Sequence, residues 1–409
     1  MNGLTKMFSL ACRGFLKYKL IHTVVQMLRH SMNNNKVFFA ATGLKLISIL
    51  GLLMMPFQIG VFIEFLGLTP SQAGLIASLE TSALALGVVL VSFRMIPLTM
   101  VSTATVGVVL VIAGNLVSAL LVGQLEIIAA RCITGLGYGI ANATASRLIA
   151  TCFPVPESAA GKMYAVTYIA ATAMYYFFPP IIADGGSYIF FWGLTLLVLV
   201  ICPVLVYLPR NTDDRMANPK TTSIQALFFR LPVIGFFLIE ILLMLGLGAI
   251  WAFAERFAVN IDLSVQRIGL YFALSSGTQF LGACLAAYLG IRFGRTKPLT
   301  LSLIPWAIFS IVLATANNEW AFAVGILGYQ FILAFYIPYM LGVGAAFDKG
   351  GNIAAAVIGV QIFSFGAGSY LGGLVADSYG LAAIGWLAIF CCGISILLFP
   401  KITKPLESH

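Results

Sequence analysis

Long apolar stretches alternate with short polar ones along almost the whole chain. Each stretch has roughly the 20 residues that an α-helix needs to cross the hydrocarbon core of a bilayer. Backbone polar groups in lipid must be satisfied within the span, so runs of this length predict helices rather than a barrel. We therefore expect twelve transmembrane helices, at residues 37–62, 73–93, 96–118, 123–150, 160–183, 187–208, 231–254, 267–291, 298–316, 319–344, 353–375 and 380–400.

The composition supports this interpretation. Of the 409 residues, 60% are hydrophobic and 9% are charged, whereas soluble domains have about 45–50% apolar and about 25% charged residues. A chain this apolar lacks the polar side chains to cover a surface in water, which predicts an all-α membrane protein. The seven cysteines show no CxxC or Cys/His spacing, so we interpret them as packing residues with reduced thiols.

The basic residues predict how the chain crosses the membrane. The net charge is +9, but the lysines and arginines are spread over short gaps and do not gather with aromatic residues, which argues against a nucleic-acid partner. With the N-terminus inside, only Arg256 and Arg267 fall on the outer side. Lys45 and Arg131 lie within apolar runs, and the other basic residues are on the inner side. This asymmetry predicts a multi-pass protein of the cell inner (plasma) membrane with both termini in the cytoplasm.

The chain has two similar halves. A shift of 195 residues aligns Gly51 with Gly246 and Gly74 with Gly269. A shift of 201 aligns two Pro-Leu-Thr segments, which begin at Pro97 and Pro298. Internal repetition of this kind is typical of many secondary transporters. The expected domains are an N-terminal cytoplasmic segment (1–36), two six-helix bundles (37–208 and 231–400), a cytoplasmic linker (209–230) and a cytoplasmic tail (401–409).

The segment before the first apolar run has two interpretations. Residues 1–36 are polar and basic and lack the compact apolar core of a removed signal peptide. Residues 8–28 could form a basic amphipathic helix on the membrane surface, or they could be a flexible leader, with Met32 as an alternative start. We favour the flexible leader.

Three motifs within residues 37–400 resemble the major facilitator superfamily. Residues 290–297, Gly-Ile-Arg-Phe-Gly-Arg-Thr-Lys, are similar to the family's basic glycine-containing loop. Residues 131–137, Arg-Cys-Ile-Thr-Gly-Leu-Gly, are similar to the Arg-x-x-Gln-Gly-x-Gly pattern of its proton-linked antiporters, with Thr134 in place of the glutamine. Residues 68–74 resemble the start of helix 2 in many bacterial members.

The resemblance implies two six-helix bundles that rock about a central cavity, which is lined by helices 1, 4, 7 and 10. In the loop between helices 8 and 9, Ile291 stands where the family usually has an acidic residue. The residues that match the loop motif are candidate functional residues, namely Gly290, Arg292, Gly294 and Arg295.

Four ionisable residues lie deep inside predicted helices: Lys45, Glu80, Arg131 and Glu240. Insertion scales give a cost of about 2.5–3.5 kcal/mol for such a group, so we expect each to have a function. Lys45 and Glu240 are equivalent under the 195-residue shift and have opposite charges. We hypothesise that they approach when the cavity closes on the inside and separate when it opens. Alternatively, Lys45 extends its amine to the inner surface.

Glu80 and Arg131 lie at similar depth in the first half, which favours an ion pair. A carboxylate that is buried beside a cation could bind and release a proton as the cavity opens first to one side of the membrane and then to the other. Two alternatives assign no proton transfer to these residues. The pair could be permanent and structural, or Arg131 could bond backbone carbonyls and serve only helix packing.

Other polar and aromatic residues on the predicted helices are candidates for the cavity wall. In the fourth run, residues 131–146 carry a polar and small stripe at three- and four-residue steps, and Gly135, Gly137 and Gly139 predict close helix packing. The mixture of few charges and many aromatic residues suits a partly apolar organic solute. The candidate cavity residues are Tyr138, Asn142, Tyr176, Trp251, Gln330, Tyr336 and Gln361.

The predicted function is secondary active transport of a small organic solute by alternating access. Proton-coupled efflux is the first choice and proton-coupled uptake the alternative. All three histidines lie outside the apolar runs, and no phosphate-binding loop or metal-ligand spacing is present, which argues against an enzyme, a metal or a cofactor. A channel or a receptor without transport is the alternative of another class. We expect a monomer in the bilayer, with the solute and protons as partners.

Overall fold

The computed structural model describes residues 3–92, 95, 98–121, 123–153, 156–183, 185–209, 230–290, 292–294, 296–347 and 352–407. Within these ranges, six long helices form the first half of the fold. They are α1 (Gly3–Leu66), α2 (Pro70–Ser92), α3 (Met100–Leu120), α4 (Gln124–Cys152), α5 (Pro156–Ala183) and α6 (Gly186–Ile201), which continues as the 3₁₀ helix η1 (Cys202–Tyr207).

The second half repeats this plan. Its described helices are α8 (Leu231–Ala252), the short α9 (Ala254–Val259), α10 (Val265–Leu289), α11 (Thr296–Ala314), α12 (Glu319–Phe347), α13 (Asn352–Tyr379) and α14 (Ala383–Glu407). The offset of 195 residues seen in the sequence relates both ends of α4 to both ends of α12, and the start of α2 to that of α10. The internal repeat is thus a repeat of helices.

Helix length and apolar composition agree with a membrane location. Ten of the described helices are long and apolar enough to cross a bilayer. The helices α4 and α5, of 29 and 28 residues, complete the predicted set of twelve. The helix α4 is less apolar because it carries several polar residues, and the structure buries three of them, with Arg131, Thr134 and Thr144 at 1% exposure or less.

Local sequence explains several helix ends. Thr99 and Ser264 precede α3 and α10, and each side chain accepts a hydrogen bond from a backbone N–H in the first turn, from Ser102 and Arg267 respectively. The connection between α13 and α14 contains Gly380 at φ 83°, a backbone conformation that glycine adopts without a steric penalty. These signals fix where the chain reverses direction.

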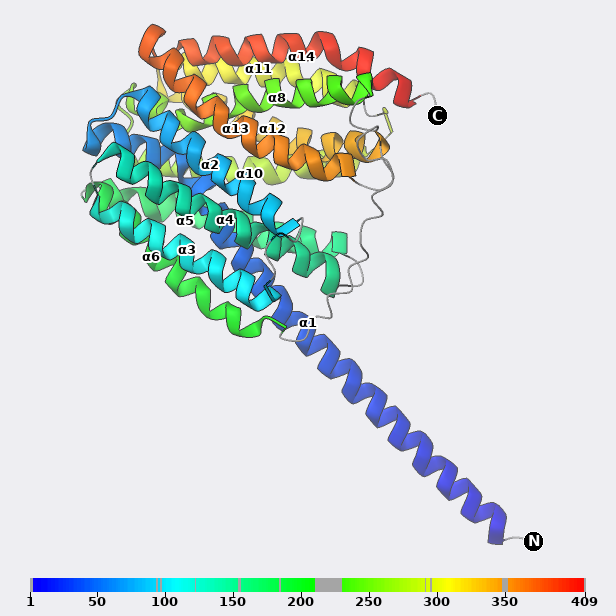
Figure 1. Ribbon diagram of the computed structural model, residues 1–409. Coiled ribbons are helices and arrows are strands. Elements are labelled where there is room, and N and C mark those ends of the chain that lie inside the picture. The colour runs from blue at the N-terminus through cyan, green and yellow to red at the C-terminus, as the bar shows by residue number, and fades with distance from the viewer. Residues whose placement is uncertain are drawn as a thin grey trace.

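All long helices run roughly along one axis, so the molecule has two ends (Figure 1). We call the end at which both chain termini lie the terminal side, and it includes the ends of α2, α4 and α12 at Ser92, Cys152 and Phe347. The opposite end, with the connections after Leu66 and Ala252, is the far side. The two halves are joined along α2 with α13 and α5 with α10. Their ribbons diverge toward the terminal side (Figure 1).

The N-terminal segment differs from our expectation. We favoured a flexible leader for residues 1–36, but α1 begins at Gly3 and continues without a break into the first transmembrane span. In Figure 1 this extension projects away from the helical bundle on the terminal side. The predicted linker 209–230 lies almost wholly outside the described residues, and the predicted tail is helical as far as Glu407.

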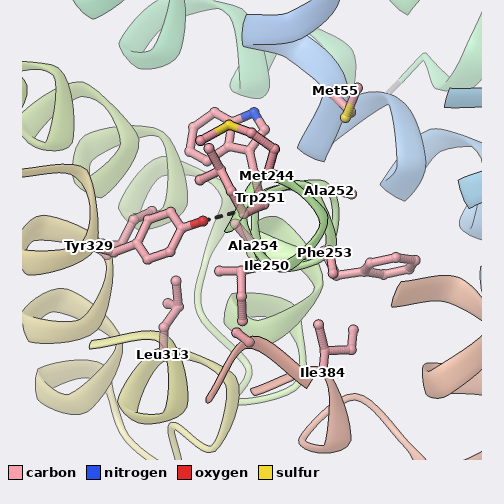
Figure 2. Close-up of a cluster of buried hydrophobic side chains, with 14 of the residues drawn as sticks. Met55, Met244, Ile250, Trp251, Ala252, Phe253, Ala254, Leu313, Tyr329 and Ile384 are labelled. Carbon is pink, nitrogen blue, oxygen red and sulfur yellow. Dashed lines mark hydrogen bonds between the residues drawn. The ribbon is translucent and has the colours of Figure 1, made fainter. Parts of the chain in front are cut away.

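The largest apolar core contains residues of both halves and extends through the second half from the far side to the terminal side. Figure 2 shows the part around the end of α8, where Met55 of α1 lies on one side and Leu313 of α11 and Ile384 of α14 lie on the other. Tyr329 of α12 donates a hydrogen bond to the backbone carbonyl of Leu247, at 3.1 Å. This core holds the end of α8 against α1 and thereby positions the polar groups described next.

Candidate functional site

An ion pair between Glu80 of α2 and Arg131 of α4 is buried in the first half. The arginine Nε donates to Glu80 Oε2 at 3.0 Å, and its Nη2 donates to Glu80 Oε1. Glu80 is 5% exposed and Arg131 is completely buried. The pairing predicted from the sequence is therefore present, in a bidentate arrangement that fixes both side chains.

Neutral side chains complete this network. Gln58 Nε2 donates to Glu80 Oε2, and Arg131 Nη1 donates to Asn115 Oδ1, each at 2.7 Å. The guanidinium also lies 5.1 Å from the centre of the Phe191 ring. Four helices, α1 to α4, thus converge on one ion pair. Gln58 and Asn115 are not among the predicted site residues, because a neutral polar residue in an apolar run carries no sign of its partner.

Close packing of α2 against α4 places the two charges together. A Cβ atom at Gly135 would lie 2.9 Å from the backbone carbonyl carbon of Glu80, and one at Gly139 would lie 2.9 Å from that of Leu84. Only glycine allows this approach without displacing a backbone. The predicted role of the α4 glycines in helix packing is confirmed.

A second polar group surrounds Lys45 of α1. Its Nζ donates to Asn142 Oδ1 of α4 at 2.8 Å and lies 5.0 Å from the centre of the Tyr164 ring of α5. Lys45 is 7% exposed, and no carboxylate of the described residues forms an ion pair with it. A buried ammonium with only neutral partners is poorly compensated.

Glu240 of α8 has the complementary arrangement in the second half. It is completely buried. Its Oε1 accepts from the hydroxyl of Tyr336 on α12 at 2.7 Å, and its Oε2 accepts from Nε2 of Gln361 on α13 at 2.6 Å. Within the described ranges it forms no ion pair. Three predicted site residues are therefore in direct contact.

The helices α1 and α8, which carry Lys45 and Glu240, meet each other. The indole N–H of Trp251 donates to the backbone carbonyl of Leu52, at 2.9 Å, where α8 crosses α1. Lys45 lies seven residues before Leu52 and Glu240 lies eleven residues before Trp251, which correspond to about two and about three helical turns. Both charges therefore lie on the terminal side of this crossing, and each bonds to side chains of its own half.

The far side is closed between the halves. Arg256 of α9 donates to Glu255 through Nε and Nη2, both at 2.6 Å, and to Glu64 of α1 through Nη1, at 2.8 Å. Burial raises the pKa of Glu255 above its ordinary value, and the adjacent Arg256 only partly opposes this effect. The backbone N–H of Ser71 donates to the carboxylate of Asp377, at 3.1 Å.

Aromatic rings from both halves pack against one another near these polar contacts. Phe57 of α1 lies 4.9 Å from Phe272 of α10, and Tyr175 of α5 lies 5.6 Å from the same ring, measured between ring centres. The Tyr175 hydroxyl donates to the backbone carbonyl of Leu53, at 3.2 Å. Trp251, a predicted cavity residue, also belongs to this cluster.

The remaining predicted residues are not all part of these groups. Tyr138 is fully buried on α4, and Gln330 is 2% exposed on α12. Neither the Tyr138 hydroxyl nor Gln330 Oε1 has a hydrogen-bond partner in the part of the chain that the structure describes. Tyr176 lies apart from them, because it is 50% exposed in a groove between α5 and α10. Its neighbour Tyr175 is buried in the aromatic cluster between the halves.

The predicted loop motif forms a tight connection between α10 and α11. Gly290 has φ 51° and Gly294 has φ 73°, values that favour glycine at both positions. The guanidinium of Arg292 lies 5.1 Å from the centre of the Tyr288 ring. Arg295 lies outside the described residues. Among those described, no cluster of three or more His, Cys, Asp or Glu side chains could hold a metal ion.

Comparison with known proteins shows the fold. No protein-family model matches the chain. A solved D-xylose–proton symporter has a TM-score of 0.73 and 16% identity, covering 93% of this chain and 99% of that one. A mutant of the nucleoside transporter NupG has a TM-score of 0.70 and 15% identity, covering 90% and 98%. The xylose transporter XylE from E. coli, in an inward-open conformation, has a TM-score of 0.68 and 14% identity, covering 92% and 99%.

The agreement extends over nearly the full length of both chains, so it concerns the arrangement of all twelve helices and not one bundle. At identities this low, the likeness is one of fold. The chain therefore has the fold of these transporters, that of the major facilitator superfamily, with two pseudo-symmetric bundles of six helices.

Proposed function

We propose that this protein is a secondary active transporter that moves a small organic solute across the inner membrane by alternating access. The observation that carries the proposal is the pair of charges Lys45 and Glu240. They lie on opposite halves, both on the terminal side of the contact between α1 and α8, and each has only neutral partners. The solved proteins that share this fold are transporters by name. Uncompensated charges at bilayer depth are costly and are retained where a mechanism uses them.

The described state has the far side shut. The contacts of Arg256 with Glu64 and of Trp251 with Leu52 join the halves there, and the halves diverge toward the terminal side (Figure 1). The excess of lysine and arginine on the terminal side makes it the cytoplasmic side. We therefore assign this structure to the inward-facing state. A channel is disfavoured, because a pore requires a path through both sides at once.

Closure of the terminal side brings Lys45 and Glu240 together. The halves pivot about the far-side contacts, so residues near the terminal side approach most. In the closed state each charge gains the other as a partner and its desolvation is offset. In the open state the two separate, as they are here. The pair thus acts as a gate whose energy depends on the charge of Glu240.

Glu240 is the group we assign to proton coupling. Because its partners are the neutral Tyr336 and Gln361, it changes protonation without breaking an ion pair. Protonation of Glu80 would weaken its two hydrogen bonds from Arg131. Glu80 is therefore our second candidate for proton coupling. Proton-driven efflux is our first choice of direction. Uptake with protons is the alternative, favoured by the similarity to a D-xylose–proton symporter.

The test is solute flux into vesicles that contain the purified protein. A panel of sugars, nucleosides and apolar cations is supplied with an imposed pH gradient. We expect saturable flux of at least one class that collapses when the gradient is dissipated. Glu240→Gln should abolish the dependence on the gradient, while Glu126→Gln, an exposed carboxylate on α4, should not. Absence of gradient-driven flux for the whole panel would count against transport.

The gate is tested by exchanging the charges. Lys45→Glu and Glu240→Lys each place two like charges on facing helices, which should lower flux at least tenfold. The double exchange restores attraction and should recover a large part of it. If the double variant is no better than either single variant, Lys45 and Glu240 do not meet during the cycle.

A further inference from the structure

A groove on the second half lies outside the mechanism proposed above. It has a volume of about 440 Å³ and is formed by the terminal-side ends of α10 and α11 and by the middle of α12. Its lining is apolar except for Lys297 and Ser302, and no acidic side chain takes part. Leu301 and Phe293 on its rim are 64% and 61% exposed. The groove therefore opens on the outer surface of the bundle, where lipid lies.

Positive charge is concentrated at the mouth of this groove. Lys297 is exposed in the first turn of α11, at the terminal side, and the groove continues one turn deeper past Leu301. Arg292, next to the rim residue Phe293, is held over the Tyr288 ring. The connection that presents these cations depends on Gly290 and Gly294, both at positive φ. A basic mouth above an apolar floor matches a phospholipid in both charge and polarity.

We propose that this groove is a binding site for an anionic phospholipid of the terminal-side leaflet. One acyl chain occupies the apolar floor between α10 and α12. The phosphate lies at Lys297, which lines the groove, and at Arg292, which is adjacent to the rim residue Phe293. Each basic residue near a membrane surface contributes about 1 kcal/mol to attraction of anionic lipid, so removal of one charge lowers relative affinity about fivefold.

This inference does not rest on transport. It gives a function to the basic loop motif, which the proposed gate does not use. The lipid must have an anionic headgroup and an acyl chain, of any length, attached to it. Glycerol phosphate, which has the charge and lacks the chain, should not compete.

The experiment is native mass spectrometry of the purified protein from vesicles of phosphatidylglycerol and phosphatidylcholine in equal amounts. We expect preferential retention of phosphatidylglycerol. The double variant Lys297→Gln, Arg292→Gln should lose this preference, while Lys162→Gln, an exposed lysine on α5 of the first half, should keep it. Leu301→Trp places a large ring on the rim and should lower retention of both lipids.

Two results would overturn the proposal. The first is equal retention of both lipids by the unmodified protein, which indicates exchangeable annular lipid only. The second is an equal loss of phosphatidylglycerol in the Lys162→Gln variant, which indicates nonspecific attraction to basic residues. Thermal unfolding of each variant checks that it folds. We expect no loss of stability, because all the exchanged side chains lie at the surface.

Discussion

At the scale of single residues, buried charges fall into two kinds. Glu80 and Arg131 neutralise each other through two hydrogen bonds, and Asn115 and Gln58 occupy further positions around them. Lys45 and Glu240 have no such partner within the described residues. The first kind is expected to stabilise one arrangement of α2 and α4. The second kind is expected to change partners during function.

Neutralising one member of the Glu80–Arg131 pair should destabilise the fold. Glu80→Gln leaves a buried guanidinium without a counter-charge, and such losses are about 3–5 kcal/mol. The double variant Glu80→Gln, Arg131→Met removes both charges and should lose less than the two single variants combined. Chemical unfolding in detergent measures these differences. If Glu80→Gln is as stable as Glu126→Gln, the pair has no structural role.

Glu255 predicts a dependence of the far-side closure on pH. Burial raises its pKa in the closed arrangement, and Arg256 and Glu64 are the charged groups that act on it there. Opening exposes the carboxyl group, and its pKa returns toward the ordinary value. The closed far side therefore holds the proton more tightly. This contribution is fully present below the ordinary pKa and is lost as pH rises through the raised value.

We accordingly expect acid on the far side to favour closure there. The measurement is the distance between spin labels at Leu125 and Trp320, which lie at the far-side ends of α4 and α12 and are each 80% exposed. The population with the short distance should fall as pH rises in the unmodified protein and change less in Glu255→Gln. A pH response that is identical in both proteins would exclude Glu255 as its source.

At the scale of helices, close contact between α2 and α4 holds the ion pair. Gly135→Ala places a Cβ 2.9 Å from the backbone carbonyl carbon of Glu80, so the two helices must move apart, and stability should fall by about 1–3 kcal/mol. Gly277→Ala on α10 is the matched control, since a Cβ there has no neighbour within 4 Å. Thermal unfolding of both variants provides the comparison. Equal melting temperatures would show that α4 moves without cost.

The helices were largely predictable from sequence, because burial in lipid requires unbroken apolar runs. The run 123–150 corresponds to α4 and 231–254 to α8, within two residues at each end. The interruption after Ala252 was not predictable. Phe253 leaves the helical ψ there, and the following turn carries Arg256 to Glu64 of the other half. The contact that accompanies this break is tertiary, and the local pattern does not contain it.

The site was predictable where residues carry a charge. Lys45, Glu80, Arg131 and Glu240 were found because a charge in an apolar run has few structural explanations. The choice of Tyr176 over Tyr175 had no such support, since adjacent residues differ only in the helix face they occupy. The structure buries Ala171 on the same face as Tyr175, four residues later, and the sequence alone does not show which face of this helix is buried.

At the scale of the whole molecule, the account requires the two halves to move as units. The helices α4 and α12 correspond by the internal repeat, and their ends mark both sides of the protein. In the described state the far-side contacts are made and the terminal-side charges are apart. A rocking motion exchanges these conditions. The distances between the two halves on the far side and on the terminal side should therefore never shorten together.

The most direct test measures both sides in one protein. Spin-label pairs at Leu125 and Trp320 report the far side, and pairs at Thr151 and Ala346, exposed near the other ends of the same helices, report the terminal side. Distance distributions in lipid nanodiscs are recorded across a pH series for the unmodified protein and for Lys45→Met. The account predicts reciprocal changes, with a shorter terminal-side distance wherever the far side lengthens, and a shift of Lys45→Met toward the terminal-open state. Distances that stay fixed on both sides, or that shorten together, would contradict it.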